Sequence, residues 1–176
     1  MDKKFRLKDK FNFSKVKILK ICAYTLCLIA SIALLAGFNF QPFAAAVNSR
    51  KIPIYCVDRS DNKVAITFDA AWGADKTQKI LDVCHRYGVK ATFFLVGFWI
   101  DNYPDMVKKI DEMGHTIGTH SETHPKMGSL SAEKITQELS SSMKKITDLT
   151  GKEVKLFRAP FGDYSNRLLE VAEGMG

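Results

Sequence analysis

The sequence contains few cysteines, and none of them form a closely spaced pair. Its 176 residues include four, which are Cys22, Cys27, Cys56 and Cys84. The CxxC spacing of zinc ribbons and of c-type haem attachment is therefore absent. Cys22 and Cys27 lie in an apolar run, whereas Cys56 and Cys84 follow it. Oxidising surroundings would permit a disulfide between the last two, although a domain of this size does not require one, and free thiols are the alternative.

Beyond its first 20 residues, the sequence also lacks an excess of charge of either sign. The net charge of the whole chain is +7. Residues 1–20 hold eight basic and two acidic side chains, and the other 156 residues hold 18 basic and 17 acidic ones. No internal repeat or low-complexity segment is visible. Because the body is nearly neutral, we expect no nucleic-acid partner.

A single long apolar run follows the basic residues. Residues 21–38 contain no charged side chain, and about 18 to 20 apolar residues are enough to cross a bilayer. Lysines ahead of such a run place the N-terminus in the cytoplasm. We therefore predict a basic cytoplasmic tail (1–20), a single transmembrane helix (21–38) and a domain outside the cell membrane. The alternative is a signal segment cleaved near Ala46, after which the protein is secreted.

The rest of the chain alternates between short apolar runs and segments with helical spacing. Residues 39–61 are predicted to form a linker and a first strand (52–57), and an α/β domain follows over residues 62–176. Further strands are expected at 64–68, 91–96, 115–119 and 154–157, and helices at 77–87 and after Pro104, Ser131 and Ser165. Such alternation favours a parallel sheet or a (β/α) barrel. About four βα units are visible, fewer than a full barrel has, so we expect the N-terminal part of a longer protein.

Two charged side chains stand at the ends of predicted strands. Asp69 follows the apolar run 64–68, and a carboxylate at the carboxyl end of a buried parallel strand can act as a general base. The alternative for Asp69 is a helix N-cap or turn residue. Arg158 follows the run 154–157, where its guanidinium could hold a carboxylate in place.

Two histidines four positions apart form the third candidate feature. His120 and His124 follow Gly118 at the end of another predicted strand. This spacing allows both imidazoles to bind one metal ion. The alternative is a pair of surface loop histidines. The other two histidines, His85 and His115, are assigned to structural roles.

Taken in order, these segments resemble the first three motifs of the polysaccharide deacetylases, the NodB-homology or carbohydrate esterase family 4 group. The matching segments are residues 67–69, 120–124 and 158–162, and the run 91–97 resembles a strand of the same family. The amino-acid sequence of residues 68–73 and the apolar run before the domain resemble the sporulation-type, cell-wall-directed branch of this family.

The resemblance implies a distorted (β/α) barrel, here truncated, and metal-dependent removal of N-acetyl groups from a cell-wall polysaccharide such as peptidoglycan. By position, Asp69 matches the catalytic base and Arg158 the residue that orients it. His120 and His124 match the two histidine ligands of a divalent metal, expected to be zinc. Trp72 is a candidate for stacking on sugar rings, as is Trp99, with ordinary packing as the alternative for both.

The sequence departs from the family pattern at two points. The family has a second aspartate, the third protein ligand of the metal, directly after the base, but this chain has Ala70 there. Because catalytic zinc has three protein ligands, two histidines alone should bind more weakly, unless Asp75 substitutes. The family's later motifs, which include a histidine general acid, find no match before Gly176.

These departures leave two rivals to the deacetylase hypothesis. One is a catalytically impaired, deacetylase-like domain that binds wall glycan without turnover, or an inactive fragment. The other is a signalling or export protein whose function resides in residues 21–38.

Overall fold

The computed structural model describes residues 17–32, 34 and 50–176. The chain divides into two compact units, Met1–Ser49 and Arg50–Gly176. In the first unit, residues 17–32 are helical. None of the described helices is both long enough and apolar enough to cross a membrane.

The predicted transmembrane helix over residues 21–38 is therefore not confirmed. Residues 33 and 35–38 of that range lie outside the described residues. The same holds for most of the predicted basic tail, for residues 39–49 of the predicted linker and for the cleavage position near Ala46.

The second unit is built on a parallel sheet of three strands in the order β1-β2-β3. The strands are β1 (Thr67–Ala70), β2 (Thr92–Leu95) and β3 (Thr116–Thr119). The register pairs Asp69 with Phe94 and Leu95 with Thr119. Because the strands are parallel and in sequence order, their carboxyl ends share one edge of the sheet. This arrangement agrees with the predicted α/β class.

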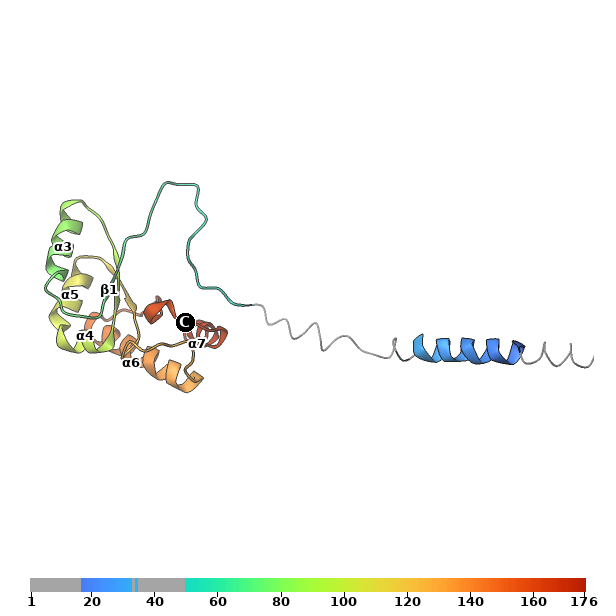
Figure 1. The fold of residues 1–176 in the computed structure, drawn as a ribbon. Coiled ribbons are helices and arrows are strands. Elements are labelled where there is room, and N and C mark those ends of the chain that lie inside the picture. The colour runs from blue at the N-terminus through green and yellow to red at the C-terminus, as the bar shows by residue number, and fades with distance from the viewer. Residues whose placement is uncertain (1–16, 33, 35–49) are drawn as a thin grey trace, which may run out of the picture. The chain divides into compact units, whose positions relative to one another are not determined.

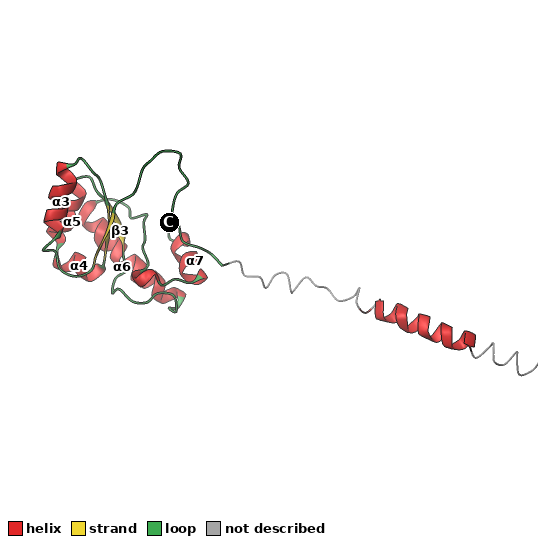
Figure 2. Ribbon diagram, turned by 45° about the horizontal axis from the view of Figure 1, so that its top comes forward, coloured by secondary structure: helices red, strands yellow, loops and turns green. Residues whose placement is uncertain are grey.

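The helices connect the strands and cover the sheet. They are α3 (Thr77–Arg86), α4 (Gly97–Asn102), α5 (Pro104–Glu112), α6 (Ala132–Thr150) and α7 (Asn166–Gly174). In Figure 1, α3 and α5 lie to one side of the strands and α7 to the other, and Figure 2 shows the same order from a second direction. Four of these helices match predicted segments, whereas α4 was not predicted.

The helix ends follow from local sequence. Ser131 and Ser165 each accept a hydrogen bond from a backbone N–H in the first turn, from Lys134 and Leu168 respectively. Such side-chain caps satisfy amide groups that lack an intrahelical partner. Gly151 ends α6 with a φ of 69°, a conformation that glycine adopts without steric cost.

The predicted first strand over residues 52–57 is wrong, because the described chain makes no sheet pairing there. Ile54 remains 87% exposed. The next strand also begins later than predicted, at Thr67 instead of Val64. Its pairing starts where the Thr92 amide donates to the Ile66 carbonyl, since β2 offers no earlier partner.

The predicted strand over residues 154–157 is reduced to a single parallel bridge between Thr119 and Phe157. The Thr119 amide donates to the Leu156 carbonyl, and the Arg158 amide donates to the Thr119 carbonyl. This short pairing is nevertheless enough to bring Arg158 to the carboxyl edge of the sheet.

The main hydrophobic core lies between the sheet and α3, α4 and α5. Trp99 is only 1% exposed and belongs to this core with Phe93 and Leu95. Its indole N–H donates to the Gly73 carbonyl at 2.7 Å. Trp99 is therefore a packing residue and not a sugar-stacking one. Cys84 is buried in the same cluster and Cys56 is exposed, and both are free thiols.

Candidate active site

The carboxyl edge of the sheet brings together three of the predicted site residues. Asp69 lies in β1, His120 directly follows β3, and Arg158 directly follows the bridge at Phe157. In parallel α/β folds this edge is where ligands bind and reactions occur. The strand order, and not sequence distance, sets this grouping.

Arg158 and Asp69 form the central ion pair. Arg158 Nη1 lies 2.7 Å from Asp69 Oδ1, and Arg158 Nη2 donates to Thr67 Oγ1 at 2.9 Å. The guanidinium carbon lies 4.3 Å from the centre of the Phe94 ring, a cation–π contact. Arg158 therefore fixes one oxygen of Asp69 and leaves the other, Oδ2, available.

His120 faces that available oxygen with a defined tautomer. His120 Nδ1 lies 2.8 Å from the Arg158 carbonyl oxygen. Because a carbonyl only accepts, Nδ1 donates, and Nε2 of the neutral ring carries the lone pair. Nε2 lies 3.9 Å from Asp69 Oδ2. Burial lowers the pKa of His120, against opposing contributions from the Arg158 carbonyl and Asp69, so the neutral ring is favoured.

His124 stands next to His120, with 4.9 Å between the ring centres. Its backbone lies in the left-handed region, with φ of 59°, and so does that of Ser121, with φ of 71°. Ser121 Oγ accepts a hydrogen bond from the His124 amide at 3.0 Å. Two such conformations in non-glycine residues within four positions indicate a loop that its surroundings hold in place.

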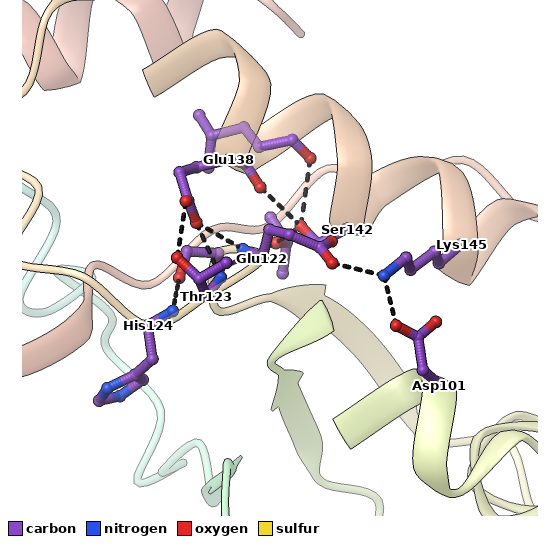
Figure 3. A network of polar contacts seen from close by, with 10 residues as sticks. Asp101, Glu122, Thr123, His124, Glu138, Ser142 and Lys145 are labelled. Carbon is purple, nitrogen blue, oxygen red and sulfur yellow. Dashed lines mark hydrogen bonds and ion pairs between the residues drawn. The ribbon is translucent and has the colours of Figure 1, made fainter. Parts of the chain in front are cut away.

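Figure 3 shows what holds this loop. The Glu138 carboxylate on α6 accepts hydrogen bonds from the amides of Glu122 and Thr123 and from the Thr123 hydroxyl. Glu122 in turn forms an ion pair with Lys145 of α6, which also pairs with Asp101 of α4. None of these side chains was predicted to matter, because acids and lysines along a helix ordinarily indicate a solvated face.

Exposed aromatic rings flank His124. The Phe161 ring centre lies 4.7 Å from that of His124, and the Trp72 ring centre lies 6.5 Å from it. Trp72 is 81% exposed and also contacts Phe98. Phe161 has a φ of 59°, unusual for a bulky residue. Aromatic faces beside a polar site suit the apolar face of a sugar ring, so Trp72 remains a candidate for sugar stacking.

The donor atoms at this edge fit the expected divalent metal only in part. His120 fits a ligand role, because its Nδ1 is fixed by a carbonyl and its Nε2 is left as a donor. His124 supplies a second imidazole beside it. No third donor joins them: over the described part of the chain, no three His, Cys, Asp or Glu side chains are grouped to hold a metal ion.

The two positions considered for a third ligand explain this. Ala70 has no donor atom, and it packs against the hydrophobic core. Asp75 instead forms an exposed ion pair with Lys76 at 2.9 Å. The residues present therefore fit the two-nitrogen part of a metal site, with lower expected affinity than a three-ligand site.

The remaining two histidines lie away from this site. His115 is buried and accepts a hydrogen bond from the Ala91 amide through Nδ1. His85 is exposed on α3. Their placement agrees with the structural roles predicted for them.

The comparisons with known proteins identify the family. A family model described as polysaccharide deacetylase matches residues 57–176. This chain belongs to that family. Among curated relatives, the peptidoglycan-N-acetylmuramic acid deacetylase PdaA of Bacillus subtilis is 32% identical over 123 residues, which are 69% of this chain and 47% of PdaA. The chain spans less than half the length of the curated relatives it matches first.

Solved structures of the same family include both enzymes and a pseudoenzyme. A family 4 carbohydrate esterase from Bacillus anthracis has a TM-score of 0.62 and 39% identity, covering 64% of this chain and 55% of that one. A CE4 family pseudoenzyme from Bacillus anthracis has a TM-score of 0.64 and 31% identity, covering 66% of this chain and 41% of that one. The NodB-type α/β fold therefore accommodates both outcomes.

Proposed function

We propose that this protein hydrolyses N-acetyl groups on a cell-wall glycan such as peptidoglycan. The observation that supports this most directly is the Asp69–Arg158 ion pair, with His120 Nε2 beside the second carboxylate oxygen. In the reaction, water adds to the acetyl carbon and the carbon–nitrogen amide bond breaks. The products are acetate and a free amine on the sugar.

Asp69 has the placement of the general base. Its Oδ1 is held by Arg158, while its side chain is 41% exposed and open to water. A carboxylate in this position can take the proton of an attacking water molecule. The guanidinium fixes the direction of the Asp69 carboxylate, so Arg158 acts as a positioning residue.

His120 and His124 are proposed to hold a divalent metal, with zinc the expected ion. Such an ion, when bound, polarises a carbonyl and lowers the pKa of bound water. The chain's own contribution is twofold: burial favours the neutral His120 ring, and the hydrogen bond from Nδ1 to the Arg158 carbonyl leaves Nε2 as the donor atom. Of the described residues, these two supply the nitrogen ligands.

We propose that the domain acts outside the cell membrane. Support comes from the basic residues that precede a charge-free apolar run at 21–38. The run serves as an anchor, or as a signal segment removed near Ala46. Protease treatment of intact cells should degrade the domain, and the molecular mass of the purified protein distinguishes the anchor from the cleaved form. Protection from protease in intact cells would overturn this placement.

The direct test of activity is acetate release from acetylated glycan. The purified protein is supplied with Zn²⁺ or Co²⁺ and with N-acetylglucosamine oligomers or peptidoglycan. We expect release well above that of an Asp69→Asn variant. Relatives named for N-acetylmuramic acid and for N-acetylglucosamine are both similar to this chain, so the sugar that carries the new amine should be identified. Equal release by protein and variant would refute the hydrolase.

A second candidate is a deacetylase-like domain that binds wall glycan without turnover. Ala70 favours it, because it leaves the donor set one ligand short. Metal analysis separates the two candidates. Stoichiometric metal that is lost in His120→Ala and His124→Ala supports the hydrolase, whereas glycan binding by metal-free protein with no acetate release supports the binder.

A further inference from the structure

Glu138 is a buried acidic residue whose carboxylate accepts hydrogen bonds from two successive backbone amides. It lies on α6 and is only 8% exposed. Glu138 Oε2 accepts from the Glu122 amide at 3.0 Å and from the Thr123 amide at 2.8 Å. Glu138 Oε1 accepts from the Thr123 hydroxyl at 2.7 Å. All three donors belong to the loop between His120 and His124 (Figure 3).

Glu138 lacks the cationic partner that buried carboxylates usually have. Among the described residues it takes part in no ion pair, whereas neighbouring Glu122 pairs with Lys145. A buried carboxylate is costly unless its oxygens accept enough hydrogen bonds. The loop amides supply those bonds. The burial of Glu138 therefore depends on the loop, and the loop amides depend on Glu138 as their acceptor.

The loop has a backbone that requires such support. Ser121 and His124 both adopt positive φ values, which non-glycine residues rarely do. Its carbonyl groups are bound on the other side, where Gly97 N–H donates to Ser121 O at 3.0 Å and Phe98 N–H donates to Glu122 O at 3.3 Å. Glu138 therefore secures the amides of the loop, and α4 secures its carbonyls.

The two histidines depend on this support unequally. The His120 amide donates to the Leu95 carbonyl of β2, and its ring is tied to the Arg158 carbonyl. Among the described residues, the His124 amide donates its hydrogen bond within the loop itself, to Ser121 Oγ. Loss of Glu138 should therefore displace His124 while His120 stays in place.

We propose that Glu138 is the positioning residue for His124: it fixes the loop so that the second imidazole stands beside the first. The inference rests on the proposed function, because it assigns Glu138 a task in the site formed by those histidines. The Glu138 carboxylate supports the loop that holds His124 but not the backbone that holds His120. Loss of Glu138 should therefore affect one imidazole and not the other.

The test uses the full chain and three variants. Glu138→Leu removes both oxygens, and Glu138→Gln keeps the shape and one acceptor. Leu139→Ala is the matched control, since Leu139 is the next residue on α6, is buried among apolar side chains and has no side-chain group that could bind the loop amides.

The first readout is amide hydrogen exchange in metal-free protein. Exchange of the Thr123 amide is expressed relative to that of Phe94 in β2, which corrects for any loss of global stability. We expect this ratio to rise about tenfold or more in Glu138→Leu and less in Glu138→Gln. Leu139→Ala should leave the ratio unchanged. An unchanged ratio in Glu138→Leu, or an equal rise in Leu139→Ala, would overturn the proposal.

The second readout is Zn²⁺ or Co²⁺ affinity measured by competition with a chelating dye. We expect Glu138→Leu to weaken binding about 10- to 100-fold, as outer-shell substitutions do, and Leu139→Ala to leave it unchanged. If the wild-type chain binds no metal but Glu138→Leu still raises the Thr123 exchange ratio, the metal proposal fails and the positioning role stands. Equal metal affinity in Glu138→Leu and wild type would overturn the link to His124.

Discussion

His120 and His124 are separated by three residues, yet different parts of the molecule hold them. His120 continues the strand pairing, because its amide donates to Leu95 and its ring to the Arg158 carbonyl. His124 lies in a loop whose amides are bound by a carboxylate of α6. The strand edge is therefore preorganised by backbone register, and the loop by side chains from distant helices.

The strand edge is also where the chemistry is best formed. Asp69, Arg158 and His120 are joined by contacts of 2.7 to 3.9 Å between side chains or backbone. The loop contributes one imidazole, and no described residue joins the two histidines as the third member of a metal-binding group. Three predictions test this contrast, beginning with the largest expected effect, and a fourth concerns a histidine outside the site.

The first prediction concerns the proposed base. Asp69→Asn should lower the rate of acetate release about 10²- to 10⁴-fold, because the amide cannot accept the proton of water as a carboxylate does. Thermal unfolding should change little, since Asp69 is partly exposed. Asp148→Asn, an exposed acid paired with Lys144 on α6, is the control and should keep full activity. A variant of Asp69 that retains the rate would show that the base lies elsewhere.

The second prediction concerns the geometry of the base. Arg158→Lys keeps the positive charge but cannot bind Asp69 and Thr67 together while stacking on Phe94. We expect kcat/KM to fall about 10²-fold, as for a misplaced catalytic group. Arg59→Lys provides the control, because Arg59 forms an exposed pair with Asp61. Equal losses in both variants would argue against a positioning role for Arg158.

The third prediction concerns the contact between α4 and the loop. A Cβ added at Gly97 would lie 2.1 Å from Glu122 Oε2, so Gly97→Ala must displace the Glu122 side chain and its ion pair. The free energy of unfolding should fall by about 1–3 kcal/mol, as in other overpacked sites. This value is to be measured by urea denaturation.

Gly174→Ala is the control for that experiment. Gly174 ends α7, and a Cβ there would meet nothing within 4 Å. The substitution should raise stability by about 0.4–1 kcal/mol, by restricting the unfolded chain. If Gly97→Ala stabilises the protein as much as Gly174→Ala does, the close packing of Glu122 on Gly97 does not contribute to the free energy of unfolding.

The fourth prediction concerns pH and a histidine outside the site. Burial, with a smaller contribution from Lys90, lowers the pKa of His115 below its ordinary value of 6.5. Between these two pKa values the unfolded chain binds the proton and the folded chain does not. The contribution of His115 to stability is therefore complete above pH 6.5 and is lost progressively as the pH falls through and below that value.

Urea denaturation across pH 5 to 8 measures this dependence. Replacement of His115 by glutamine should reduce the loss of stability on acidification. His85→Gln, at an exposed position on α3, should leave it unchanged. Any pH dependence of stability that remains in the His115 variant includes a contribution from His120, whose pKa is also lowered by burial. An unaltered pH profile in His115→Gln would contradict the assignment.

Four of the five helices that follow residue 50, and the alternation of strands with helices, could be predicted because local patterns encode them. Ser131 and Ser165 cap helices where predicted, and Gly151 ends α6 with a positive φ. The failures fall on segments whose state depends on a partner. Residues 52–57 have a strand-like composition but form no strand pairing with any described residue, and residues 154–157 form one bridge. A strand needs hydrogen bonds to a neighbour, which composition cannot supply.

The residues of the candidate site likewise divide into those that local sequence predicted and those that it missed. Asp69, His120, His124 and Arg158 were predicted from motif spacing and from their places at strand ends. The parallel pairing of β1, β2 and β3 places the carboxyl ends of these strands at one edge of the sheet. Glu138 was missed, since its sequence neighbours give no sign that it faces the loop. The two tryptophans looked alike in sequence, but Trp99 is buried and Trp72 is 81% exposed beside His124.

The sequence alone determined the family motifs, the α/β order and the absence of a donor at position 70, because each is a property of residue type and spacing. Only the tertiary structure decided that Arg158 holds one oxygen of Asp69, that His120 presents Nε2, and that Glu138 supports the loop of His124. Those contacts join residues 15 to 89 positions apart. Packing of the chain brings such residues together, and no local pattern records it.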